Sequence, residues 1–202
     1  MNEYNRMISK VIVNRIMEFS NKLFEKDKYI FQHSMRVFDY CYLMGFKLGL
    51  SKEEIETLCI AAFYHDIGRI TASHNNIKKM GFPFYDVNTT TLTHPRISAG
   101  LLRTAGGSKE AIKVVACHHE RYDGAGYPYG LVGKNIPLLA RVLTIADMFD
   151  VMMTSRHPSV ELSRDEAMHR LIADCGTRYD TNLVYMFLDL IIGPYEQQLE
   201  AV

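Results

Sequence analysis

The stretch CHHERYDGAGYPYGLVGKNIP, residues Cys117–Pro137, decides how the rest of the chain is interpreted. It begins with two adjacent histidines, His118 and His119, where the preceding pattern predicts a helix end. Neighbouring residues on a helix point roughly 100° apart, so both imidazoles can reach one centre only near a helix terminus or in a wide cluster. The glycines and prolines that follow stop the helix and predict a long, shaped loop. This pattern favours a metal site, although two surface histidines before a turn fit the stretch alone equally well.

Length, composition and charge indicate one globular domain. The 202 residues suffice for a full core, and 48% hydrophobic residues is typical of globular proteins. Basic and acidic residues balance at 23 each, so no general basic field would attract a long nucleic acid. We expect a cytoplasmic protein without membrane insertion. Its four cysteines lie far apart, residues 1–11 are no signal peptide, and no apolar run reaches ~18 residues.

Hydrophobic periodicity predicts an all-α fold, a single-domain helical bundle. Capping boxes at Ser51 and Ser163 mark two helix starts. Residues 71–93 are expected to form a loop long enough to be functional. We expect residues 1–28 to form an N-terminal helix that packs on the core, and residues 29–202 to form the main domain. The predicted helices span residues 4–24, 29–48, 51–66, 94–105, 108–119, 137–153, 163–175 and 179–192.

Seven polar residues interrupt apolar helices or their ends, and together they predict a metal centre. A buried carboxylate must be paired or bind a metal, and several buried imidazoles near one another leave lone pairs unsatisfied. Neutral imidazole with carboxylate suits iron, manganese or zinc. Seven ligands are too many for one ion that keeps an open position, so two bridged ions, the usual device for hydrolysing phosphate esters, fit better. The seven are His33, His65, Asp66, His94, His118, His119 and Asp147.

The order of His33, the pair His65-Asp66, and Asp147 resembles the HD phosphohydrolase superfamily. The run from His118 to Pro137 is similar to its HD-GYP subfamily, and this run is far more specific than the HD pair. The resemblance covers most of the chain and implies an HD-domain fold. It also implies a bacterial signalling hydrolase, a cyclic di-GMP phosphodiesterase. The implied reaction yields linear pGpG, or GMP, through a bridging hydroxide at a binuclear metal centre of two divalent ions, iron with manganese as the alternative.

The resemblance further assigns roles to the seven residues. His33, His65, Asp66 and Asp147 would hold one ion, and Asp66 would bridge to the second, held also by His94, His118 and His119. Asp66 and Arg69 are the implied catalytic residues. Three-metal members carry a glutamate where this chain has Tyr29, a poor ligand at neutral pH, so we expect two ions.

Substrate contacts are expected from residues around the centre. Arg69 stands where the family motif HDxGK has a lysine that grips the phosphate, and it keeps the positive charge. Arg141 fits a phosphate contact and a structural ion pair equally well. Glu120 and Asp123 are expected to orient the ligand histidines. The full predicted substrate-binding set is Arg69, Lys79, Asp123, Gly126, Tyr127, Pro128, Arg141 and Arg156, although the segments around Lys79 and Arg156 diverge from the family pattern.

Other functions also fit the sequence. The altered basic contacts leave room for another cyclic dinucleotide, such as 3',3'-cyclic GMP-AMP, or for a nucleotide phosphohydrolase. From a different class, the chain fits a catalytically weak signalling adaptor that binds diguanylate cyclase domains through the GYP loop. The complete ligand set favours an enzyme, because such a cluster is costly without metal. The first predicted helix, apolar on one side, fits a homodimer face or core packing.

Overall fold

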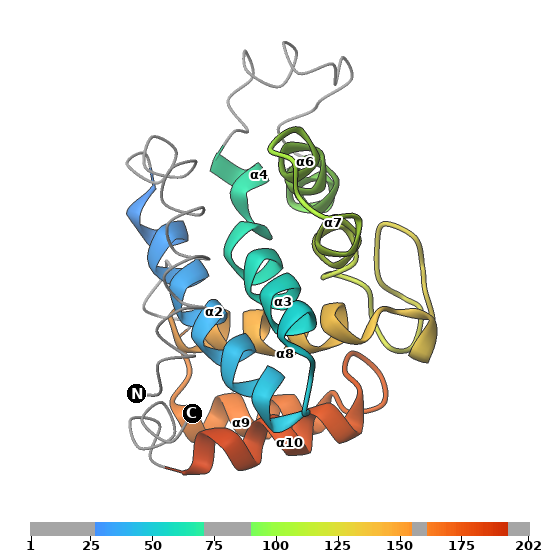
Figure 1. Cartoon of the computed structure of the whole chain (residues 1–202). Helices are drawn as coiled ribbons and strands as arrows, with labels where there is room; N and C mark the ends of the chain where they lie inside the picture. Colours follow the sequence, from blue (N-terminus) through green and yellow to red (C-terminus); the bar gives the residue numbers. More distant parts are fainter. Residues whose placement is uncertain (1–26, 71–89, 155–160, 194–202) are drawn as a thin grey trace.

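The structure is a computed structural model that describes residues 27–70, 90–154 and 161–193 (Figure 1). Within these ranges there is no strand, only an isolated bridge between Cys175 and Tyr179, so the predicted all-α fold is confirmed. The helix predicted over residues 4–24 and the predicted contacts Lys79 and Arg156 lie outside the described residues. The elements are α2 (Lys28–Lys47), α3 (Lys52–Tyr64), α4 (Ile67–Ile70), α6 (Thr90–Thr104), α7 (Lys109–Ala116), η2 (Gly133–Asn135), α8 (Leu138–Met153), α9 (Arg164–Ala173) and α10 (Thr181–Ile192).

The helices enclose one core, and the largest fully buried side chains in it include Phe63, Phe149 and Phe187. Helix α2 packs along α3, and α8 contacts both (Figure 1). Helices α6 and α7 pack together beside α4 and α3, while α10 contacts α2, α8 and α9. Among the helices of the described ranges, none combines the length and apolar character that crossing a membrane requires.

Two helix boundaries differ from those predicted. Helix α6 begins at Thr90 rather than His94, so Pro95 lies inside the helix instead of in its first turn. Gly68, predicted to end a helix, lies within the short helix α4. A Cβ at Gly68 would lie 2.7 Å from the carbonyl oxygen of His94. The N–H of Gly68 donates to Ser98 Oγ at 2.9 Å. Gly68 therefore lets α4 approach α6, which brings the residues before α4 close to His94.

The loop between α7 and α8 is held by its own buried carboxylate. Glu120, 2% exposed, accepts backbone N–H groups of Tyr129 at 2.7 Å and Leu131 at 2.9 Å. Gly126 packs so closely on the preceding turn that a Cβ there would lie 2.2 Å from the backbone nitrogen of Arg121. The loop is thus closed on itself, as its glycines and prolines predict.

The segment before α10 fixes the outer side of this loop. The N–H of Asp123 donates to the carbonyl of Thr177 at 2.8 Å, and that of Tyr122 to the carbonyl of Arg178 at 3.2 Å. These bonds join two segments far apart in the sequence. They make the loop part of the folded body of the protein.

Candidate metal centre

The seven predicted ligands come from α2, α6 and α8 and from the segments that follow α3 and α7, and they meet in the interior of the bundle. Six have exposed fractions of 6% or less, and His119 is half-buried. Helix α2 supplies His33 and α8 supplies Asp147, while His65 and Asp66 follow α3, His94 lies in α6, and His118 and His119 follow α7. The described structure therefore brings together all seven residues that the sequence predicted as ligands.

Backbone carbonyls fix the direction of two imidazoles. The Nδ1–H of His65 donates to the carbonyl of Ala62, and that of His118 to the carbonyl of Val115, each at 2.7 Å. Each partner lies three residues earlier, at the end of the preceding helix. Because Nδ1 carries the proton, Nε2 presents its lone pair to the centre. Both imidazoles are thereby prepared as ligands.

The Nε2 atoms of neighbouring imidazoles face one another at close range. The separations are 3.1 Å for His33 and His65, 3.3 Å for His94 and His118, and 3.1 Å for His94 and His119. Two lone pairs this close repel unless a proton or another cation lies between them. Polar groups without partners are costly inside a protein. The donor set therefore fits divalent metal ions, which imidazole and carboxylate bind well.

Asp66 lies between two groups of predicted ligands. The first group is His33, His65 and Asp147, and the second is His94, His118 and His119. Its Oδ1 is 3.1 Å from His94 Nε2, while its Oδ2 is 3.9 Å from His65 Nε2 and 4.0 Å from His33 Nε2. Asp147 Oδ1 approaches His33 Nε2 at 3.2 Å. The carboxylate of Asp66 thus faces the first group with Oδ2 and the second with Oδ1, which is the arrangement that a bridging ligand needs.

The potential ligand atoms form three overlapping sets. Within each set the atoms lie within 4.8 Å of one another. His65 belongs to two sets, as does His118, so the sets are continuous. Such continuity suits two ions held close together, as in centres that hydrolyse phosphate esters. The sets are His33, His65 and Asp66; His65, His118 and Asp147; and His94, His118 and His119.

The two carboxylates, His118 and His119 are in the protonation states that cation binding needs. Burial raises the pKa of Asp66 and of Asp147, but nearby histidines, joined by Arg69 in the case of Asp66, outweigh it and hold both pKa values well below the usual range. Burial and the neighbouring imidazoles lower the pKa of His118 well below normal, and burial chiefly lowers that of His119 to about 4. Two ionised carboxylates and two neutral imidazoles therefore face the centre.

His33 is held by a network that the sequence analysis missed. Its Nδ1–H donates to Asp150 Oδ2 at 2.7 Å, and Arg36 donates to the same carboxylate at 2.6 and 3.0 Å. Although burial lowers the pKa of His33, its bonds to Asp147 and Asp150 raise it to about 10. A cation that binds its Nε2 must displace a proton. Asp150 orients the ring, as carboxylates behind ligand histidines commonly do.

Arg69 stands at the edge of the centre. Its Nε donates to Asp66 Oδ1 at 2.7 Å, and its Nη2 lies 3.4 Å from His94 Nε2. The side chain is 37% exposed. The guanidinium therefore contacts both the ligands and the solvent, and its catalytic and substrate-binding roles stay predictions.

The predicted contacts from the GYP loop divide into two groups. Tyr127 lies at the centre: its ring is 5.1 Å from the ring of His119, and its N–H donates to the His119 carbonyl at 3.2 Å. Pro128 follows it and is half-buried. Gly126 permits the tight turn before them. Asp123 is exposed and pairs with Arg121, so its expected role in orienting a histidine is wrong.

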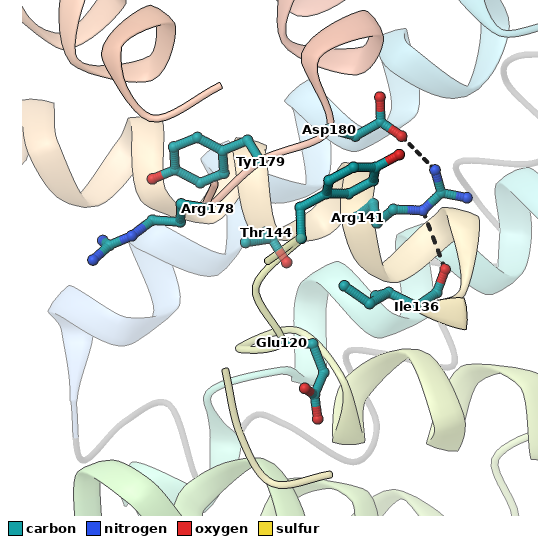
Figure 2. Close-up of a pocket in the computed structure, with 8 residues that line it drawn as sticks. Glu120, Ile136, Arg141, Thr144, Arg178, Tyr179 and Asp180 are labelled. Carbon is teal, nitrogen blue, oxygen red and sulfur yellow. Dashed lines mark hydrogen bonds and ion pairs between the residues drawn. The ribbon is translucent and has the colours of Figure 1, made fainter. Parts of the chain in front are cut away.

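Glu120 differs from the expectation placed on it, whereas Arg141 follows one of its two alternatives. Glu120 stabilises the loop instead of a ligand histidine. Arg141 pairs with Asp180 and donates to the carbonyl of Ile136 at 3.1 Å (Figure 2). It lines a small pocket with Glu120, Thr144 and the segment before α10, as Figure 2 shows. This placement matches the structural alternative for Arg141 and gives no support to a substrate contact.

Comparison with known proteins gives a family match over most of the chain. A family model described as HD domain matches residues 18–183. The chain is 39% identical over 146 residues to the cyclic di-GMP phosphodiesterase response regulator RpfG of Xanthomonas campestris, covering 70% of this chain and 38% of that protein. It is 30% identical over 188 residues to the 3'3'-cGAMP-specific phosphodiesterase 1 of Vibrio cholerae, covering 92% of this chain and 42% of that protein. The chain thus spans about two fifths of the length of these curated relatives.

Solved structures share the fold. An HDG"Y"P protein from Bdellovibrio bacteriovorus superposes with a TM-score of 0.65 at 22% identity, over 83% of this chain and 54% of that one. A cyclic GMP-AMP phosphodiesterase of V. cholerae gives a TM-score of 0.64 at 22% identity, over 81% of this chain and 44% of that one. At this identity, the likeness concerns the fold.

Proposed function

The chain belongs to the HD domain family, with the HD-GYP resemblance confirmed, and we propose that it is a metal-dependent phosphodiesterase that hydrolyses cyclic di-GMP to linear pGpG. One observation carries the proposal: seven ligand side chains converge in the core, and Asp66 faces two groups of them with its two oxygens. Such an arrangement is costly unless cations bind it.

We propose two ions in this centre, iron with manganese as the alternative. Bound there, they would activate water as the nucleophile and neutralise charge on the phosphodiester. His33, His65, Asp147 and Asp66 would hold one ion, and Asp66, His94, His118 and His119 the other. Tyr29 supports the number two: its hydroxyl donates to the carbonyl of Thr154 at 2.6 Å rather than serving as a ligand.

The other residues bind and position the substrate in this proposal. Arg69 offers a cation at the edge of the centre and forms bidentate bonds to phosphate oxygens well. It stays protonated at neutral pH, so the leaving 3'-oxygen takes its proton from water. Tyr127 forms a wall beside His119 and limits the access of bulk water.

A second substrate, 3',3'-cyclic GMP-AMP, is favoured by one comparison. The relative named for this nucleotide aligns with 92% of the chain, whereas RpfG aligns with 70%. Both nucleotides present the same phosphodiester to the centre, so the chemistry is common to the two proposals. They differ in one base.

Product analysis tests both proposals. The purified chain, loaded with Fe²⁺ or Mn²⁺ under anaerobic conditions, is incubated with each cyclic dinucleotide, and products are separated by chromatography. We expect linear pGpG from cyclic di-GMP and no product with Asp66→Asn. The matched control is Asp189→Asn, an exposed carboxylate paired with Lys47, which should retain full turnover. A metal-loaded chain that opens neither nucleotide would refute both cyclic dinucleotide proposals and leave the nucleotide phosphohydrolase and the adaptor as the remaining interpretations.

A further inference from the structure

Arg69 contacts two atoms of the second ligand group at once. Its Nε donates to Asp66 Oδ1 at 2.7 Å, and its Nη2 lies 3.4 Å from His94 Nε2. These two acceptor atoms are 3.1 Å apart. The guanidinium therefore faces the pair of ligand atoms through which Asp66 and His94 would share an ion.

An N–H donor and a metal ion cannot both use one lone pair. In the tautomer that binds a metal through Nε2, the imidazole of His94 has a single lone pair on this atom, and Arg69 Nη2 lies 3.4 Å from it. Asp66 Oδ1 has a second lone pair, but a fixed positive charge at hydrogen-bond distance repels a second cation in a low-dielectric interior. The contacts of Arg69 thus oppose ion binding at this pair of atoms.

We propose that Arg69 is a tethered cation that competes with the second divalent ion for Asp66 and His94. The inference rests on the proposed two-ion centre and concerns only its second half. Among its described bonds, Arg69 reaches Asp66 only at Oδ1, the oxygen that faces His94, and none of them reaches His33, His65 or Asp147. The first ion, on the side of Asp66 Oδ2, should therefore be affected less than the second. Because the side chain is 37% exposed, the guanidinium can turn toward solvent without disturbing the core. Occupancy of the second ion would then depend on where Arg69 points.

The opposite role for Arg69 makes the opposite prediction. If the guanidinium orients Asp66 as a supporting partner, its removal should weaken metal binding by about 10–100-fold. If it competes, its removal should strengthen binding of the second ion. The sign of the change therefore decides between the two roles, and no knowledge of the substrate is needed.

The experiment is a titration of the full chain with Mn²⁺, monitored by calorimetry and by electron paramagnetic resonance. The resonance spectrum separates isolated Mn²⁺ from a spin-coupled pair. In Arg69→Gln we expect the affinity of the second ion to rise about tenfold or more, with the coupled spectrum at lower Mn²⁺ concentration. The affinity of the first ion should change less than that of the second, and its retention verifies the fold.

A matched control separates competition from the loss of charge alone. Arg96 is exposed on α6, two residues after His94, so Arg96→Gln removes one positive charge without a contact to the ligands. It should leave both affinities unchanged. An equal gain in Arg96→Gln, or an unchanged or weaker second site in Arg69→Gln, would overturn the proposal.

Arg69→Lys provides a second variant in case the glutamine disturbs the fold. An ammonium is a single point donor and does not span two acceptors as the planar fork does. We expect a smaller gain in second-ion affinity than in Arg69→Gln, and a loss would again contradict competition. Because these readouts use Mn²⁺ alone, they remain valid if the chain hydrolyses neither cyclic dinucleotide.

Discussion

Asp150→Asn offers a sharp test of how the centre is built. The carboxylate is 1% exposed and binds His33 Nδ1 at 2.7 Å, Arg36 at 2.6 and 3.0 Å, and Thr154 Oγ1 at 3.0 Å. Asparagine keeps the shape but replaces one acceptor oxygen with a donor. The side-chain donors that bonded to that oxygen then face the N–H₂ group of asparagine and lose their acceptor. The change also leaves the Arg36 guanidinium without its counter-charge.

The expected magnitude follows from burial. A buried donor without a partner costs about 1–3 kcal/mol, and breaking a buried ion pair costs about 3–5 kcal/mol. The Arg36 side chain is 35% exposed, so water compensates part of the second cost. We therefore expect the free energy of unfolding of the metal-free chain to fall by about 2–4 kcal/mol. Loss of the orienting bond to His33 should also lower the affinity of the centre for the first ion by about 10–100-fold.

The assay is urea unfolding followed by circular dichroism, together with Mn²⁺ titration. Asp189→Asn is the matched control, because Asp189 is also ion-paired but its side chain is 75% exposed. It should change stability by less than about 0.5 kcal/mol and leave metal affinity unchanged. If Asp150→Asn unfolded like the wild type and bound the first ion equally well, the argument that Asp150 supports His33 would be refuted.

Three further outcomes are expected. Asp66→Ala should abolish turnover and lower the metal content measured by mass spectrometry, because it removes the ligand that faces both groups; full activity would contradict a shared carboxylate. Gly126→Ala should cost about 1–3 kcal/mol in urea unfolding and impair turnover, since its Cβ would lie 2.2 Å from a backbone nitrogen. Gly130→Ala, whose Cβ would meet its nearest atom only at 3.6 Å but whose backbone is left-handed, should cost about 1–2 kcal/mol and retain turnover. An equal loss of turnover in the two variants would show that the loop adapts to the clash at Gly126. Burial raises the pKa of Asp39 to about 6, so its contribution to stability is full below about pH 4 and is lost as the pH rises through 6. Asp39→Asn should therefore be more stable than the wild type at pH 8 by about 1–3 kcal/mol and equal to it near pH 3.5 in urea unfolding, and a pH-independent difference would contradict this assignment.

The fold, and the meeting of the seven polar residues in the core, were predictable from the sequence for physical reasons. Periodic apolar positions and capping boxes define helices locally, and the capping boxes at Ser51 and Ser163 are both present. The ligands were recognisable because polar residues interrupt strongly apolar helices, as Asp147 does in α8. Such interruptions are visible without knowledge of how the helices pack.

Contacts between distant segments were not predictable in the same way. The bond from His33 to Asp150 joins residues 117 positions apart and depends on how α2 docks on α8. One signal was available: Arg36 follows His33, and Asp150 follows Asp147, by three positions on two helices, so each pair shares a helix face. The ion pair of Arg141 with Asp180 and the loop bonds of Glu120 depend on tertiary packing as well.

The most direct test of the two-ion centre is metal analysis of the chain purified without oxygen, coupled to product detection on the same sample. We expect about two ions of iron or manganese per chain, as in two-metal phosphoesterase sites, with linear dinucleotide appearing from cyclic di-GMP or 3',3'-cyclic GMP-AMP. A chain that binds no metal even when Fe²⁺ or Mn²⁺ is supplied would contradict the account, because the seven converging ligands would then have another purpose.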